Sequence, residues 1–203
     1  MTSSGEAPEL VAIFADADAQ RFVMRLIDAG MERGCLRRFV VEPVRDPMRD
    51  AHVARDPLSV AQSFLSNPNV RFLVLWDHHG SGREIDPPQD VERDITAAFL
   101  RAGVPAERVL AIAFVPELEI ALEPVWDRVC EELAKKRKDP ALEAVFDAND
   151  PKGALEAIAR RHRIRLNPAL FQELAGSLSI PKLKSRDPLA RVGARLVEWF
   201  APA

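Results

Sequence analysis

Short apolar runs recur along the first half of this chain. They occupy residues 10–14, 36–42, 70–76 and 109–114, and the second run is built around Phe39, Val40 and Val41. A strand with one face in water alternates apolar and polar positions, whereas a strand covered on both faces is apolar almost throughout. The runs therefore predict four strands that are mostly buried in a sheet.

Between these runs, apolar residues return at helical spacing. This spacing predicts helices over residues 16–34, 58–65 and 89–102. Residues 43–57 show no apolar period, and we interpret them as a long surface loop. Strands that alternate with helices favour an α/β fold, with a mostly parallel four-stranded sheet flanked by helices.

The second half of the chain has a helical pattern throughout. An amphipathic stripe begins at Trp126, and further helices are expected over residues 151–163, 168–178 and 188–200. We therefore expect two parts. The first is an α/β domain over residues 8–116, and the second is an all-helical C-terminal region over residues 117–203 that packs on it.

Composition limits the function classes. The 203 residues are 47% hydrophobic and 29% charged, which is enough to bury a substantial core. The formal net charge of -3 gives no global attraction for nucleic acid, so such a role needs a local basic patch. No leader pattern and no run of about 20 apolar residues is present, and Cys35 and Cys130 lack metal-site spacing. We expect a cytoplasmic protein with no membrane partner.

The most informative stretch is the run at residues 70–76, which ends in an acid, two imidazoles and a glycine-rich turn. Asp77, His78 and His79 follow it directly, and Gly80-Ser81-Gly82 comes next. Acids also follow two other strands, because Asp16 and Asp18 come after the first and Glu117 and Glu119 after the last. Since the carboxyl ends of parallel strands meet at one edge, we expect these side chains to lie near one another.

Carboxylates gathered at one edge raise one another's pKa unless a cation neutralises them, and oxygen ligands suit Mg²⁺ or Mn²⁺. The expected metal ligands are Asp16, Asp18, Asp77, His79 and Glu119, and the expected catalytic residues are Asp77, His79 and Glu117.

Each of these assignments has a structural alternative. Asp16 or Asp18 also fits as a cap of the first helix. In a helix, Glu117 and Glu119 would not share a face, so one of them would point away from the cleft. The glycine turn at residues 80–82 is either a phosphate-binding nest or a simple turn, and it lacks the lysine of a P-loop.

Basic residues of the second half form the candidate nucleic-acid contacts. Lys152 follows Asp150-Pro151 at the start of a helix, where a cation opposes the helix dipole unless it reaches an acid or a phosphate. The ordinary alternative is a set of solvated helix ends. The expected contacts are Lys152, Arg160, Arg161 and Arg163, and the same basic segment continues with Arg165, Lys182, Lys184 and Arg186.

The acid near the end of the first strand and the step Asp77-His78-His79 resemble the Toprim fold of topoisomerases, primases and overcoming-lysogenization-defect nucleases. That fold places a Glu at the end of its first strand, where Ala15 or Asp16 stands here. It places Asp-x-Asp after a later strand, where His79 replaces the second acid. The resemblance implies a Toprim-like sheet and a metal-dependent nuclease or phosphohydrolase.

A resemblance over nearly the whole chain is to a group of small bacterial Toprim-like proteins. It is carried by residues 77–84, by Pro116-Glu117-Leu118-Glu119, by Asp150-Pro151-Lys152 and by residues 196–200. In particular, the chain is similar to the small accessory component of the methylation-associated anti-phage defence system. Such proteins often carry a Trp soon after Pro-Glu-Leu-Glu, whereas Trp126 comes later here.

This resemblance implies a restriction-modification-like role in antiviral defence, with other defence-system proteins, and DNA, as partners. Two alternatives stay open. One is a non-catalytic assembly subunit that docks a modification or restriction partner. The other is a small phosphohydrolase that uses Asp77 as a metal ligand.

Overall fold

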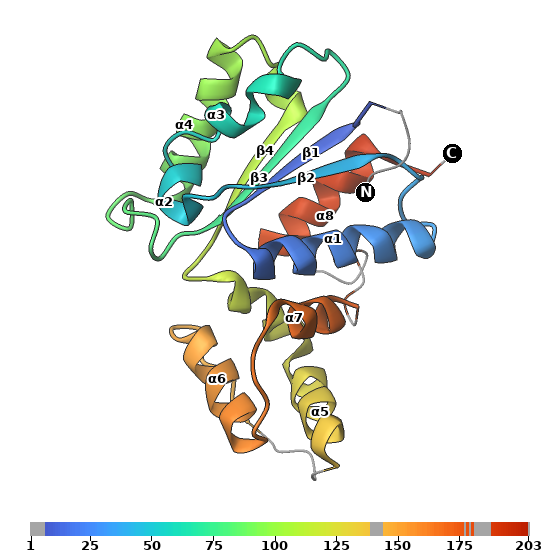
Figure 1. Cartoon of the computed structure of the whole chain (residues 1–203), viewed down its shortest axis with the longest axis vertical. Coiled ribbons are helices and arrows are strands. Elements are labelled where there is room, and N and C mark those ends of the chain that lie inside the picture. Colours follow the sequence, from blue (N-terminus) through green and yellow to red (C-terminus); the bar gives the residue numbers. More distant parts are fainter. Residues whose placement is uncertain (1–6, 139–143, 177, 179, 181–187, 203) are drawn as a thin grey trace.

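A four-stranded parallel sheet forms the centre of the computed structural model, which describes residues 7–138, 144–176, 178, 180 and 188–202 (Figure 1). The strands are β1 (Leu10–Phe14), β2 (Val41–Arg45), β3 (Arg71–Asp77) and β4 (Val109–Phe114). Their order across the sheet is β2-β1-β3-β4, and all neighbouring pairs are parallel. The predicted α/β class, with helices flanking a parallel sheet, is confirmed.

Three strands, β1, β3 and β4, lie within one residue of where the sequence predicts them. All five residues of β1 are fully buried, as is the centre of β3, because helices cover both faces of the sheet. The second strand is present, but its predicted bounds are wrong, since β2 begins at Val41 instead of residue 36. As an edge strand β2 is only partly buried, and it tolerates Pro43 because only one of its sides needs ladder hydrogen bonds.

The predicted loop over residues 43–57 is also wrong. It contains the end of β2, the short helix α2 (Arg49–Val53) and the residue before α3 (Leu58–Ala61). The carboxylate of Asp46 closes this segment, because it accepts a hydrogen bond from the Met48 backbone N–H (2.8 Å) and lies 2.6 Å from the His52 ring. A helix held by such contacts needs no long apolar period, so the sequence pattern does not reveal it.

Helices cover the two faces of the sheet separately (Figure 1). On one face, α1 (Ala17–Glu32), α7 (Pro168–Ala175) and α8 (Pro188–Trp199) pack on a core that includes Leu73 and Leu75. On the other, α2, α3 and α4 (Pro88–Arg101) pack on a core that includes Phe72 and Val74. The remaining elements are α5 (Trp126–Arg137), α6 (Pro151–Arg161) and the short 3-10 helices η1 (Gln62–Phe64), η2 (Ala106–Arg108) and η3 (Leu118–Val125).

The C-terminal half is helical, as predicted. The helices α5 and α6 extend away from the sheet, α7 returns to pack along α1, and α8 lies against the sheet (Figure 1). Leu155 of α6 and Leu196 of α8 belong to the same buried cluster as Leu73 of β3. The division of the chain at residue 116 stays a prediction. Every helix in the described part of the chain is too short or too polar to traverse a lipid bilayer.

The strand order creates a switch point at the carboxyl edge of the sheet. After β1 the chain turns into α1 on one face, and after β3 it leads to α4 on the other face. Since β1 and β3 are neighbours, a crevice is expected outside their carboxyl ends, which is where open α/β sheets bind ligands. Asp16 and Asp77 stand at these two strand ends.

Candidate functional site

Asp77 is the last residue of β3 and lies partly buried between two other segments. Its Oδ1 accepts a hydrogen bond of 2.8 Å from the backbone N–H of Leu118, at the start of η3. Its own backbone N–H donates to Oδ1 of Asp50, in the first turn of α2, also at 2.8 Å. Asp77 therefore holds two acidic segments at the edge of the sheet: its backbone holds the start of α2, and its side chain holds the start of η3.

The environment of Asp77 disfavours its charged form. Burial is the largest cause, and neighbouring negative charges add to it, so that the pKa of Asp77 rises from 3.8 to about 9. In decreasing order of effect, the neighbouring acids are Asp50, Asp16, Glu119 and Glu117. At neutral pH the Asp77 carboxyl therefore keeps its proton unless a cation replaces it.

The two acids that follow β1 behave differently. Asp16 caps α1, because its Oδ1 accepts a hydrogen bond from the Ala19 backbone N–H (2.8 Å). The capping alternative is therefore confirmed for Asp16, yet its charge also acts on Asp77. Burial, followed by the charge of Asp16, raises the pKa of Asp18, and Oδ1 of Asp18 is buried without a hydrogen-bond partner in the described part of the chain.

Glu117 and Glu119 both face this edge. Glu117 has an extended backbone (φ -146°) and precedes η3, so the argument that two helical positions must point apart does not apply. Glu119 is 7% exposed, and burial raises its pKa to about 7 against the opposing effects of its own backbone N–H and of Lys152. Both carboxylates raise the pKa of Asp77.

Lys152 brings a positive charge to the same acids. Its Nζ lies 3.4 Å from Oε1 of Glu117, and the Lys152 side chain is half exposed. Burial lowers the pKa of Lys152, but the charges of Glu117 and Glu119 raise it more, and the result lies above the usual value of 10.5. The sequence alternative of a Lys152 that reaches an acid is the one observed.

The two histidines after Asp77 differ in burial and in their neighbours. The His79 ring is 71% exposed, and its Nδ1 lies 3.5 Å from Oε1 of Glu117. The His78 side chain is buried, and its Nδ1 has no hydrogen-bond partner in the residues that the structure describes. His79 therefore lies at the rim of the acidic edge rather than inside it.

The glycine turn after the histidines is closed by the chain itself. The carboxylate of Glu84 accepts hydrogen bonds from the backbone N–H groups of Gly80 (2.8 Å) and Gly82 (3.0 Å). Both glycines have positive φ, at 84° and 70°, which suits a tight turn. Because Glu84 occupies these donors, the turn is not an open nest for phosphate in this structure.

The carboxylate oxygens at this edge are suitable ligands for a hard cation, but the described side chains are not arranged around a common point. Carboxylate oxygens are the ligands that Mg²⁺ and Mn²⁺ prefer, and the buried Asp18 Oδ1 is a donor without a partner among the described residues. In the described ranges, however, no three His, Cys, Asp or Glu side chains lie close enough together to hold a metal ion. Metal binding therefore needs side-chain rotation and loss of the Asp77 proton.

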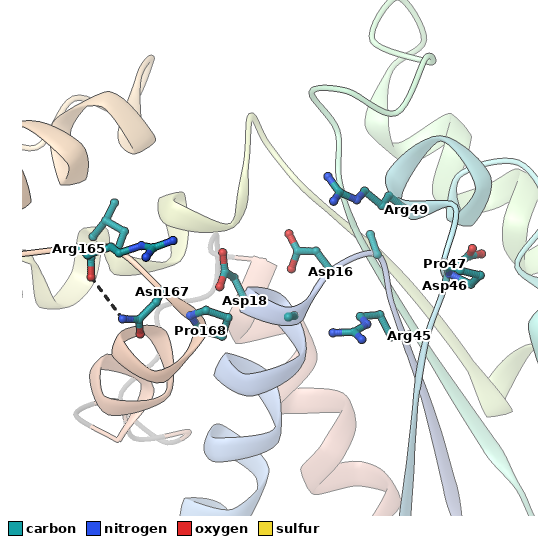
Figure 2. A pocket seen from close by; sticks show the side chains of 12 residues that line it. Asp16, Asp18, Arg45, Asp46, Pro47, Arg49, Arg165, Asn167 and Pro168 are labelled. Carbon is teal, nitrogen blue, oxygen red and sulfur yellow. Dashed lines mark hydrogen bonds between the residues drawn. The ribbon is translucent and has the colours of Figure 1, made fainter.

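Sequence reasoning missed residues on the segment that it assigned to a loop. Asp50 adds a negative charge near Asp77 at the acidic edge. Arg45 and Arg49 line a cavity of about 760 Å³ beside that edge (Figure 2). The signal was available in part, because Arg45 ends β2 at the same carboxyl edge as Asp16 and Asp77. The misplaced second strand concealed it.

The predicted nucleic-acid contacts do not form one surface. Lys152 lies at the start of α6, whereas Arg160, Arg161 and Arg163 lie at its end, about 13 Å along the helix axis. Arg161 and Arg163 line a separate cavity of about 390 Å³ with Arg137, which donates a hydrogen bond to the Arg163 carbonyl. Three further basic residues considered with them lie outside the described residues, namely Lys182, Lys184 and Arg186.

Comparisons of this chain with protein-family models, with curated proteins and with solved structures found no match.

Proposed function

We propose that this protein is a metal-dependent phosphoryl-transfer enzyme that acts on nucleic acid, with its site at the acidic edge of the sheet. The observation that carries the proposal is the position of Asp77 at the switch point. Acids that follow β1, lie in α2 and follow β4 all act there on its one carboxyl group. An acid with a strongly raised pKa in such a crevice is a candidate functional group.

Four carboxylates of this edge, Asp16, Asp18, Asp77 and Glu119, would hold a Mg²⁺ or Mn²⁺ ion. When bound, the ion supplies the positive charge that activates a water molecule and stabilises the phosphoryl transition state. In hydrolysis the water oxygen joins phosphorus, the ester P–O bond breaks, and a proton passes to the leaving oxygen.

Residues at the rim assist this chemistry. Lys152 and Glu117 form an ion pair at the rim, which fixes the Glu117 carboxylate beside the site. His79 is exposed and its Nδ1 lies against the same Glu117 oxygen, so the ring is placed to relay a proton between Glu117 and solvent. We assign the catalytic roles to Asp77, Glu117 and His79.

The biological setting that we propose is a bacterial anti-phage defence system in the cytoplasm. The sequence motifs at residues 77–84 and 116–119 support it, and both form the acidic edge in the structure. Cys35 and Cys130 are both free, in agreement with a reducing compartment. The expected partners are other proteins of that system, and DNA.

A second candidate is a non-catalytic assembly subunit. It is favoured by the absence of a ready metal-ligand group in the described part of the chain, and by the Lys152 charge that already offsets part of the acidic cluster. In that case a protonated Asp77 has a structural role, as the acceptor that holds η3. Metal binding separates the two candidates.

Removal of the Asp77 carboxyl is expected to weaken Mn²⁺ binding on the order of 100-fold, because a ligand and the centre of the acidic cluster are lost. Isothermal titration calorimetry of the parent and of Asp77→Ala at pH 8 measures it. The matched control is Asp56→Ala, since Asp56 is exposed and its carboxylate makes no hydrogen bond or ion pair with the described residues. A parent that binds neither Mn²⁺ nor Mg²⁺ contradicts the metal proposal and supports the assembly subunit.

Activity is tested on methylated and unmethylated phage DNA with the same three proteins. We expect Mn²⁺-dependent cleavage by the parent and by Asp56→Ala, and none by Asp77→Ala. Phage protection in cells should follow the same order. Full protection by a stably folded Asp77→Ala would remove catalysis at this edge from the function.

A further inference from the structure

The cavity lined by Arg45 and Arg49 lies directly beside the acidic edge. It has a volume of about 760 Å³ and lies between the start of α1, the turn after β2 and the segment that leads into α7 (Figure 2). This volume is in the range of sites for small ligands, and the cavity opens to solvent. The charged and polar residues that line it are Asp16, Asp18, Arg45, Asp46, Arg49, Arg165 and Asn167.

Three arginines from separate segments reach into this cavity, which we call the arginine pocket. Arg45 ends β2, Arg49 begins α2, and Arg165 lies between α6 and α7. Figure 2 shows their guanidinium groups turned toward the same space, with Asp16 and Asp18 between them. All three are exposed, and none forms an ion pair within 4.0 Å with a residue that the structure describes.

The acids that line the arginine pocket do not neutralise the positive charge of the three arginines. Asp46 is 1% exposed, and its oxygens are used by the Met48 backbone N–H and the His52 ring. Asp16 and Asp18 remain on the wall shared with the acidic edge. Three guanidinium groups thus face two carboxylates, and a divalent cation on those carboxylates would leave the pocket strongly positive.

We propose that the arginine pocket binds the phosphate groups of a nucleotide unit and presents a phosphate ester to the acidic edge. The guanidinium fork matches phosphate oxygens in geometry and keeps its charge at every physiological pH. This inference rests on the proposed phosphoryl-transfer function and names its substrate-binding residues. Since Asp16 and Asp18 repel a phosphate in the absence of a cation, Mn²⁺ strengthens the binding.

Arg49 offers a variant that separates binding from folding. Its φ of 61° lies in the left-handed region, where a side chain is disfavoured and a glycine is not. Arg49→Gly therefore removes the guanidinium and relieves the backbone at the same time. We expect it to melt at or above the temperature of the parent and to bind phosphate ligands more weakly.

The test is fluorescence anisotropy of a labelled ten-nucleotide single-stranded DNA, with Mn²⁺ and with EDTA. The pocket variant combines Arg45→Gln, Arg49→Gly and Arg165→Gln, and the matched control combines Arg38→Gln, Arg93→Gln and Arg101→Gln, which are exposed arginines elsewhere. We expect a loss of affinity of about tenfold for each pocket arginine removed, and only a small loss in the control. Equal losses in the two triple variants would overturn the inference.

Competition identifies the source of the phosphate. Displacement of the DNA by inorganic phosphate and by a mononucleotide at similar concentrations supports a pocket for single nucleotide units. Displacement by unlabelled oligonucleotide at far lower concentration supports a nucleic-acid strand. Failure of every phosphate compound to compete would contradict the pocket.

The failure of this inference is distinct from that of the proposed function, because Mn²⁺ binding is measured separately on the pocket variant. DNA binding that depends on the three arginines, in a protein that binds no Mn²⁺, keeps the pocket and removes the metal site. Mn²⁺ binding with DNA affinity independent of the arginines keeps the metal site and removes the pocket.

Discussion

Asp77→Asn is expected to raise the melting temperature of the metal-free protein at pH 8 while it weakens divalent-metal binding. The Asp77 carboxyl is forced to hold a proton by burial and by four neighbouring acids. Asparagine has the shape of the protonated acid, and its Oδ1 can still accept the hydrogen bond from Leu118. The substitution therefore removes an electrostatic cost without loss of the contact that holds η3.

The sign of the pH dependence follows from the direction of the shift. The folded-state pKa of Asp77 is about 9, whereas the carboxyl ionises near 3.8 in the unfolded chain, so the folded state binds the proton more tightly. Its contribution to stability is fully present below pH 3.8, decreases as the pH rises, and is lost above about pH 9. The raised pKa values of Glu119, Asp18 and Asp50 act in the same direction.

We expect the parent to lose stability between pH 5 and pH 9 in EDTA, and Asp77→Asn to lose much less. The gain at pH 8 is on the order of 2 kcal/mol, which corresponds to about 4–8 °C for a chain of this size. Differential scanning calorimetry at several pH values measures it, with Asp56→Asn as the control. At the same concentration, Mn²⁺ should raise the melting temperature of the parent and raise that of Asp77→Asn much less.

A melting temperature of Asp77→Asn below that of the parent at pH 8 would contradict this account. It would mean that the ionised carboxylate is stabilised by a charge partner at neutral pH. The neighbours of Asp77 in the described chain argue against such a partner, because the charges that act on it most strongly are all negative.

The sheet was predictable where burial alone decides the sequence pattern. Every position of β1 is buried on both faces of the sheet, so only apolar residues fit and the strand boundaries follow directly. The edge strand β2 has no such constraint, and the apolar residues before it, Leu36 and Phe39, are buried without being part of a strand. An apolar pattern reports burial, and it locates a strand only where the two coincide.

The residues of the candidate site were predictable only where the strands that carry them were predicted correctly. Asp16, Asp77 and Glu117 follow strands that the pattern located, and the parallel-sheet rule then places them at one edge. Asp50 and Arg49 depend on α2, a helix of five residues that is held by the Asp46 side chain and by the hydrogen bond from Asp77 to Asp50, and that is too short to show an apolar period. The arginine pocket could therefore be found only from the structure.

The free edge of β4 depends on an ion pair between helices from opposite faces of the sheet. Glu92 of α4 is 7% exposed, and its Oε1 accepts a hydrogen bond from the backbone N–H of Ala113 in β4 (3.1 Å). Arg191 of α8 donates to both oxygens of Glu92, at 2.9 and 2.7 Å. The pair thus covers a strand edge that would otherwise expose a backbone donor.

Arg191→Met is expected to destabilise the protein by about 3 kcal/mol, or about 6–12 °C in melting temperature. The reason is that the Glu92 carboxylate stays in its buried position without its bidentate cation. Arg195→Met is the control, because Arg195 lies one turn further along α8 and pairs with the exposed Glu198. Its cost should stay below about 1 kcal/mol.

The double variant Glu92→Gln with Arg191→Met decides the physical cause. A glutamine can keep the hydrogen bond to Ala113 through its Oε1 and carries no charge, so the double variant should melt above Arg191→Met alone. If the loss came instead from the packing of the Arg191 side chain, the second substitution would lower the melting temperature further. Recovery in the double variant would show that the buried charge of Glu92, and not the bulk of Arg191, makes this pair necessary at the edge of the sheet.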